Sequence, residues 1–386
     1  MSDSPIYLDY NATTPPDPRV ADAMAPFLRE PFGNPSSGHA WGRRARAAVE
    51  GARARVAALL QADPAGVVFT GGGTEADNHA LIGAARLRAP RGGHLVTTAV
   101  EHPAITAACR HLADFGVETT YVGVDDQGRV DPAAVAAACR PDTFLVSVML
   151  ANNEVGTLQP VAEIAALARA RGILSHTDCA QAVGKVPVGL DDLGVDMISL
   201  AGHKLYGPKG VGALVLRSGV AVANLMFGAG HEQGRRPGTE NVLAIVGLGV
   251  ACELAADDVA SEGHRLANLR DRLATIITAG QPDAVVHAAR APRLPNTLSV
   301  GFPARIAGEI MARLPDVAVS AGAACHGDAI HVSHVLQAMG VPRDVAVGTL
   351  RLSLGRMTTA AEIEAAGARI VAAAAATPRV GTGDSV

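Results

Sequence analysis

Short apolar segments alternate with longer amphipathic ones through most of the chain between residues 45 and 255. The short segments are typical of buried strands, and the alanine-, arginine- and leucine-rich stretches between them, such as residues 43–60 and 160–172, are typical of helices. This alternation predicts an α/β domain with a mostly parallel sheet, because each helix serves as the crossover between two parallel strands. We expect strands at residues 66–70, 94–98, 117–124, 143–150, 173–178, 196–202 and 211–216.

A second region follows the alternating one. A long helical stretch from about residue 241 to 280 leads into a segment that mixes strand-like and helical patterns. We therefore expect a large domain of residues 15–255 with a seven-stranded sheet flanked by helices, and a smaller α+β domain of residues 1–14 and 256–386. Ligands of open α/β sheets bind beyond the carboxyl ends of the strands, so functional residues are expected there.

Charge and hydropathy favour a soluble protein that binds small molecules. A formal net charge of −4 argues against a basic surface for nucleic acid or a polybasic membrane anchor. The longest nearly apolar run, residues 241–256, is interrupted by glycines and is too short to span a bilayer. No signal peptide is expected from the first residues. The five cysteines form no Cys-x-x-Cys pair, which predicts a reducing, cytoplasmic location without disulfides.

Lysine is scarce in this chain. Of the 33 lysine and arginine residues only Lys185, Lys204 and Lys209 are lysines. Arginine keeps its proton and forms no imine with an aldehyde, so imine chemistry has three candidate residues. Lys204 follows the apolar run 195–200 and lies between two glycine-containing turns. This place after a predicted strand makes Lys204 the preferred candidate.

A glycine-rich turn joins the first predicted strand to a helix in the sequence VVFTGGGTEADN, residues 67–78. Backbone N–H groups at such a helix N-terminus, together with the helix dipole, bind phosphate. The Gly-Lys-Ser/Thr sequence of a Walker nucleotide-binding loop is absent. The pattern is compatible with a phosphate site at Gly73 and Thr74, and also with a tight turn that Thr74 caps.

Several polar residues in or after predicted strands allow both a functional and a structural interpretation. Asp178 can keep the nitrogen of a pyridine ring protonated, which makes the ring an electron sink, or it can cap the next helix. Gln181 follows it closely. His102, at a strand-to-helix turn, can stack on a flat cofactor and carry protons, or be a structural histidine. Arg351 can hold a substrate carboxylate with two hydrogen bonds, or form a surface ion pair.

Cys325 lies in a segment of small residues that predicts a mobile loop. A cysteine exposed on such a loop is better placed to react than one buried in a helix. Together with Asp328, His331 and His334 it can also be considered as a metal ligand. The spacing of these residues matches no common zinc pattern, so we expect no metal.

Taken in order along the chain, these motifs resemble the cysteine desulfurases that depend on pyridoxal phosphate, and their close relatives the selenocysteine lyases. The resemblance covers about residues 6 to 365. Its motifs are LDYNATTP from residue 8, GNPSS from 33, GGGTEADN from 71, VEH from 100, NNEVG from 152, HTDCAQ from 176, GHK from 202, RRPGTEN from 235 and the late cysteine.

The resemblance implies the type I fold of pyridoxal phosphate enzymes, a homodimer, L-cysteine or L-selenocysteine as substrate, and a protein that accepts the sulfur. It implies that Lys204 forms an imine with the cofactor, that Asp178 pairs with the pyridine nitrogen, and that His102 stacks on the ring and aids proton transfer. The other implied roles are: Gln181 at the phenolic oxygen; Gly73, Thr74, His203 and the other subunit's Thr239 at the phosphate; Asn153 and Arg351 at the substrate carboxylate; Cys325 as acceptor of the sulfur.

The chain departs from the desulfurase pattern at Ala201, where many members have a serine that binds phosphate. We expect the loss of that hydrogen bond to weaken cofactor binding by roughly 0.5 to 1.5 kcal/mol. Residues 322–328 and 235–241 are more similar to selenocysteine lyases, so the sequence leaves both substrates open. An aminotransferase would use Lys204 and Asp178 without Cys325, and a sulfur-carrier or metal-binding module would leave Lys204 without a role.

Overall fold

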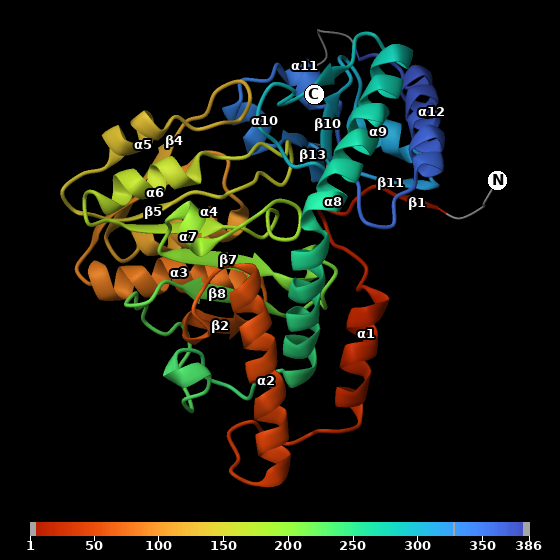
Figure 1. Ribbon diagram of the computed structural model, residues 1–386. Coiled ribbons are helices and arrows are strands. Elements are labelled where there is room, and N and C mark those ends of the chain that lie inside the picture. Colours follow the sequence, from red (N-terminus) through yellow and green to blue (C-terminus); the bar gives the residue numbers. More distant parts are fainter. Residues whose placement is uncertain (1–4, 327–328, 381–386) are drawn as a thin grey trace.

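The computed structural model describes residues 5–326 and 329–380, with the backbone alone for residues 323–326 and 329–330. The chain forms a large unit and a smaller one that share one long helix, α8 (Val242–Gly280). Figure 1 shows α8 running from the side of the large sheet into the small unit, where it lies beside α12 (Ala360–Ala376). In the described part of the chain, no helix is both long enough and apolar enough to cross a membrane.

The large unit is built on a sheet that has seven strands in the described part of the chain, in the order β2-β8-β7-β6-β5-β3-β4. Its strands run parallel, apart from β8, which is antiparallel to both neighbours. The predicted α/β class and the seven predicted strands are therefore confirmed. The strands are β2 (Val67–Thr70), β3 (Gly93–Thr98), β4 (Val117–Val122), β5 (Thr143–Ser147), β6 (Leu174–Asp178), β7 (Met197–Ala201) and β8 (Gly212–Leu216).

Helices cover both faces of this sheet. Successive side chains of a strand point to opposite faces, and the neighbours Val67 and Val68 accordingly belong to different apolar clusters. The cluster of Val68 includes α3 (Gly73–Arg88) and α4 (Pro103–Ala113). The cluster of Val67 includes α1 (Pro18–Met24), α2 (Ala40–Leu59), α5 (Pro132–Ala138), α6 (Val161–Arg169), α7 (Leu190–Leu193) and the first half of α8.

The small unit has its own apolar cluster. Helix α8 contributes to the apolar clusters of both units, because Ala255 belongs to the cluster of the large unit and Leu266 to that of the small unit. The domain boundary at residue 255 stays a prediction. Strand β1 pairs with β11 in parallel, which places the N-terminal strand in the small unit. The elements here are β1 (Ile6–Tyr7), β9 (Val285–Val286), β10 (Thr297–Gly301), α9 (Ala307–Ala312), β11 (Val317–Ala318), β12 (Ser320–Ala321), α10 (His334–Ala338), α11 (Arg343–Ala346), β15 (Thr349–Ser353) and α12.

The segment around Cys325 forms a hairpin of β13 (Ala323–His326) and β14 (Ala329–Val332), in which Cys325 pairs with Ile330. The predicted loop is therefore wrong for these residues. The physical reason is that the pairing is made by backbone groups, which a run of small residues does not reveal. The side chain of Cys325, and Asp328 as a whole, lie outside the described part of the structure.

Candidate active site

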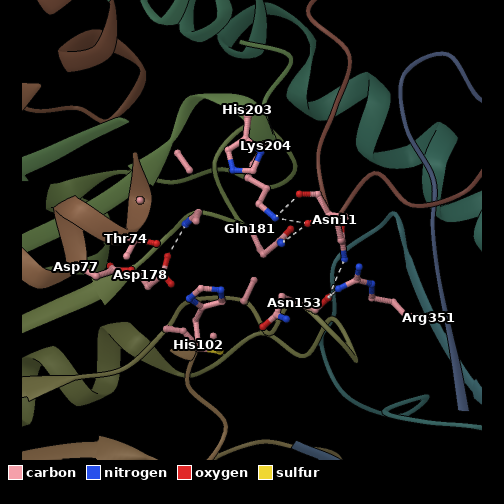
Figure 2. A pocket seen from close by; sticks show the side chains of 16 residues that line it. Asn11, Thr74, Asp77, His102, Asn153, Asp178, Gln181, His203, Lys204 and Arg351 are labelled. Atoms are coloured by element: carbon pink, nitrogen blue, oxygen red, sulfur yellow. Dashed lines mark hydrogen bonds between the residues drawn. The ribbon is translucent and has the colours of Figure 1, made fainter. Parts of the chain in front are cut away.

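A cavity of about 320 Å³ opens at the carboxyl ends of the strands of the large sheet. Nine of the eleven predicted site residues line it in the described part of the chain. The lining residues come from strand ends and the segments that follow them, from the N-terminal segment and from the small unit, and Figure 2 shows the labelled ones around one space. The lining is Asn11, Ala12, Gly73, Thr74, Asp77, His102, Met149, Ala151, Asn153, Asp178, Ala180, Gln181, Ala201, His203, Lys204 and Arg351.

Lys204 ends a short 3₁₀ turn, Gly202–Lys204, directly after β7. Its Nζ donates hydrogen bonds to the backbone oxygens of Asn11 and Ala12, the second at 3.0 Å. Burial, and after it the guanidinium of Arg351, lowers the pKa of Lys204 from 10.5 to about 8. A large fraction of the amine is then neutral in mildly alkaline solution, so Lys204 is a suitable nucleophile toward an aldehyde.

Asp178 is the last residue of β6 and is 6% exposed. Its Oδ1 accepts a hydrogen bond of 2.8 Å from the backbone N–H of Ala180, so the carboxylate holds the following turn and also lines the cavity. Burial raises the pKa of Asp178, while the Ala180 N–H and the positive charge of Lys204 oppose that effect. A cation placed against this carboxylate would be strongly favoured, because it compensates a buried negative charge.

His102 caps helix α4, and its Nδ1 accepts a hydrogen bond of 3.1 Å from the backbone N–H of Ala104. Burial lowers the pKa of His102. Because Nδ1 is an acceptor, the proton of the neutral ring lies on Nε2. In Figure 2 the ring lies across the cavity from Lys204, where it can face a flat ligand held between them. The structural and the functional interpretations of His102 are thus compatible.

The glycine-rich turn leads directly into helix α3, which begins at Gly73. Gly72 occupies the N-cap position with φ of +153°, a backbone conformation that favours glycine. Thr74 is exposed and lies inside the helix, so the alternative in which its hydroxyl caps the turn is wrong. A Cβ at Gly73 would lie 3.2 Å from the Cβ of Ala201. The start of α3 has no side-chain cap among the described residues, and Gly73 and Thr74 line the cavity.

His203 lines the same cavity as Gly73 and Thr74, and its Nδ1 lies 3.1 Å from the hydroxyl oxygen of Thr13. Burial, and then the ammonium group of Lys204, lowers the pKa of His203 to about 4. The ring is therefore neutral near pH 7 and offers one N–H to a neighbouring acceptor. A phosphate placed between Thr74, His203 and the start of α3 would find N–H and O–H donors on several sides.

Asn11 is a site residue to which the sequence motifs gave no role. It is fully buried, and its backbone oxygen accepts hydrogen bonds from Lys204 Nζ and from Gln181 Nε2, the latter at 2.9 Å. Its Nδ2 donates to the backbone oxygen of Asn153 at 3.2 Å. Its Oδ1 accepts from Lys185 Nζ at 3.0 Å. All these partners are at least 142 residues away in the chain, so no local pattern predicts that Asn11 lies in the site. The one sequence signal for Asn11 was its place in the LDYNATTP motif.

Arg351 reaches the cavity from β15 of the small unit and is 13% exposed at its side chain. Its Nη2 donates to Asp9 Oδ1 at 2.8 Å, and its Nη1 donates to the backbone oxygen of Asn153 at 3.1 Å. The ion pair with Asp9 is mostly buried, so the surface ion pair considered from the sequence is wrong. The buried Nε has no hydrogen-bond partner in the described part of the chain. A carboxylate in the cavity would supply one.

The two other predicted residues do not line this cavity. Thr239 is exposed, just before α8. Cys325 belongs to β13, and only its backbone is described. No three His, Cys, Asp or Glu side chains gather as a metal site among the residues that the structure describes.

Comparison with known proteins gives one consistent result. The family model for aminotransferase class-V matches residues 6–366. A cysteine desulfurase IscS of Anaeromyxobacter sp. (strain Fw109-5) is 47% identical over 364 residues, which is 93% of this chain and 90% of that protein. A solved NifS-like protein is 36% identical with a TM-score of 0.89, covering 95% of this chain and 98% of its own. The structure of SspA in complex with cysteine is 34% identical with a TM-score of 0.77, covering 90% and 98%.

Proposed function

Since the chain belongs to the aminotransferase class-V family, in which its relatives are cysteine desulfurases, we propose that Lys204, Asp178 and Arg351 bind the cofactor and the substrate of that reaction. The chain is an enzyme, a cysteine desulfurase that depends on pyridoxal phosphate. The observation that carries the residue assignment is the convergence of a buried amine, a buried carboxylate and a guanidinium on one cavity.

The residues of the cavity fit this cofactor. Lys204 supplies an amine of lowered pKa for the aldehyde, and Asp178 supplies a buried negative charge for the ring nitrogen. Gly73 has no side chain to obstruct the close approach of a phosphate to the start of α3. Ala201 contributes no hydroxyl, so Thr74, His203 and backbone N–H groups have to hold the phosphate, with Thr239 of a second subunit as a further proposed donor.

Pyridoxal phosphate, when bound, supplies an electron sink that stabilises negative charge at Cα of an amino acid joined to it. Asp178 keeps the ring nitrogen protonated, which that chemistry needs. Lys204, when its amine is free, would accept the Cα proton of the substrate at Nζ. His102 would face the cofactor ring and offer Nε2–H for proton transfer. Arg351 and Asn153 hold the carboxylate of the substrate and so fix its orientation.

We assign the sulfur step to Cys325. Its thiolate attacks the sulfur of L-cysteine, the S–S bond of a persulfide forms, and the C–S bond breaks, so that L-alanine leaves after protonation. The small unit supports this assignment through Ser320, which accepts a hydrogen bond of 2.9 Å from Arg351 at the cavity. Cys325 follows Ser320 by five residues, a span of at most about 17 Å in extended chain. Cys325 therefore lies in the segment that follows a contact of Arg351 at the cavity.

A selenocysteine lyase is the second candidate, favoured by the sequence of residues 322–328 and 235–241. Several relatives carry the name cysteine desulfurase, which supports L-cysteine. Comparing kcat/KM for L-cysteine and L-selenocysteine decides between them, because this ratio measures differential stabilisation of the transition state. A ratio that favours selenocysteine by orders of magnitude would support the lyase.

A homodimer and a protein that accepts the sulfur are further proposals, as is a cytoplasmic location. Exposed apolar side chains on two segments, residues 28–41 and 226–227, support the dimer. A contact of 3.1 Å between Ser36 Oγ and His231 Nδ1 brings these two parts of the chain together. The four described cysteines Cys109, Cys139, Cys179 and Cys252 are free. Light scattering tests the dimer. The exposed apolar residues are Leu28, Phe32, Trp41, Met226 and Phe227.

Borohydride reduction of the enzyme with bound cofactor tests the role of Lys204. Reduction fixes the cofactor on the amine that holds it, so peptide mass mapping should find the added mass on the peptide with Lys204. Lys185 is the internal control, because it is also buried near the cavity. Modification of Lys185 or Lys209 alone, or of no lysine, would overturn the assignment.

Arg351→Met should raise KM for L-cysteine by roughly 10- to 100-fold with a smaller effect on kcat, because a charge-assisted hydrogen bond contributes about 1.5 to 3 kcal/mol. Arg272→Met is the matched control, since Arg272 forms an exposed ion pair with Glu364 and neither residue lines the cavity. Steady-state kinetics of the two variants give the comparison. An unchanged KM for Arg351→Met would exclude this arginine as the carboxylate ligand.

A further inference from the structure

We infer that Lys185 is a positioning residue for the cofactor: it donates to the side-chain oxygen of Gln181 and so fixes that carboxamide with its N–H₂ group toward the cavity. The inference rests on the proposed function, because Gln181 acts on the cofactor there. The contact between Lys185 Nζ and Gln181 Oε1 is 2.5 Å.

Lys185 is only 9% exposed. It follows Gln181 by four residues, and the intervening Gly184, with φ of +77°, lets the chain turn back. Its other partner is Asn11 Oδ1, at 3.0 Å. Among the described residues no carboxylate forms an ion pair with it. Burial, and then the charges of Lys204 and Arg351, lowers its pKa well below the usual range. A buried amine without a counter-ion destabilises a fold, so its place here calls for a function.

The chemistry of the two partners fixes the direction of these hydrogen bonds. Both atoms that Lys185 contacts are carbonyl oxygens, and an amine donates to them whether it is charged or neutral. If the Gln181 amide were turned over, its N–H₂ group would meet the Lys185 amine, and its oxygen would meet the backbone oxygen of Asn11. Lys185 and Asn11 therefore select the same orientation of Gln181.

That orientation decides what Gln181 offers to a ligand. One N–H of Nε2 is used by the backbone oxygen of Asn11 at 2.9 Å, and Gln181 lines the cavity beside Lys204. The second N–H is left for the phenolic oxygen of a bound pyridoxal phosphate. Donation to that oxygen stabilises its negative charge and makes the neighbouring nitrogen, joined to Lys204, easier to deprotonate. Lys185 would act on the cofactor through Gln181 without touching it.

Lys185→Met tests the inference, because methionine has a similar length and no N–H. Two readouts besides turnover are measured: the dissociation constant of pyridoxal phosphate by equilibrium dialysis of the cofactor-free protein, and the pH midpoint of the visible absorption change of the loaded protein. We expect weaker cofactor binding by roughly 2- to 10-fold and a midpoint higher by roughly 0.5 to 1 pH unit, the effect of one lost hydrogen bond. Lys209→Met, which changes an exposed lysine, should leave both readouts unaltered.

A double-variant cycle separates positioning from mere structural support. If Lys185 acts through Gln181, then Lys185→Met should add nothing to the shifts already caused by Gln181→Met. The double variant also keeps the inference testable if Lys185→Met alone does not fold, because in the double variant there is no Gln181 oxygen left without a hydrogen-bond donor. Unaltered readouts in Lys185→Met, or a double variant that differs from Gln181→Met, would overturn the inference. A wild-type protein that binds no pyridoxal phosphate would instead overturn the proposed function.

Discussion

Lys204→Ala is expected to give a colourless protein that retains its fold and loses L-alanine formation by a factor on the order of 10⁴ or more, the size of loss that follows removal of a catalytic nucleophile. The reason is that no other lysine reaches the same place, since Lys185 Nζ is engaged by Asn11 and Gln181 and Lys209 is exposed. Absorption spectra after incubation with pyridoxal phosphate, together with single-turnover kinetics, provide the measurement.

Lys209→Ala is the matched control for this variant, because it removes a lysine near in sequence that does not line the cavity. It should keep the colour and the rate. If Lys204→Ala took up the cofactor covalently and formed L-alanine at a rate near that of the wild type, Lys204 could not be the residue that holds the cofactor.

Cys325→Ala is expected to abolish transfer of sulfur from L-cysteine while cofactor binding stays within about twofold of the wild type. The described cysteines are poor substitutes, because burial raises the pKa of Cys109 to about 11 and that of Cys252 to about 12. Burial also raises the pKa of Cys179 well above its usual range. A thiol of such pKa is almost fully protonated near pH 7 and is a weak nucleophile.

The measurement for Cys325→Ala is the amount of L-alanine and of enzyme-bound persulfide after one turnover. Cys139→Ala is the control, since Cys139 is a free, half-buried cysteine at the end of α5. Full turnover of L-cysteine by Cys325→Ala would refute the persulfide step. Loss with L-cysteine but retention with L-selenocysteine would favour the lyase, because a selenol leaves more readily than a thiol.

Several site residues could be predicted because they stand where a strand ends. Asp178 is the last residue of β6, and Lys204 follows β7 within three residues. The apolar periodicity locates such strand ends, and parallel strands bring their carboxyl ends to one edge of the sheet. Asn153 could not be found that way, and only the family resemblance indicated it. For Arg351 the residue type allowed a carboxylate ligand or a surface ion pair, and the resemblance favoured the carboxylate.

The hairpin around Cys325 and the role of Thr74 show where local pattern was insufficient. Small residues in 320–326 gave no sign of the backbone pairing with β14. The start of α3 depended on the φ angle of Gly72, which placed Thr74 inside the helix. In both places the outcome is set by backbone geometry and pairing, to which the side chains contribute little.

The sequence by itself determined the alternation of strands and helices, the choice of Lys204 among three lysines and the acidic residue at the end of β6, because these are properties of residue type and spacing along one segment. Only the tertiary structure decided that Asn11 joins Lys204, Gln181 and Lys185, and that Arg351 enters from the small unit. Those contacts bring together atoms of residues as many as 198 positions apart in the chain. These hydrogen bonds join segments that are far apart in the chain, so no local pattern encodes them.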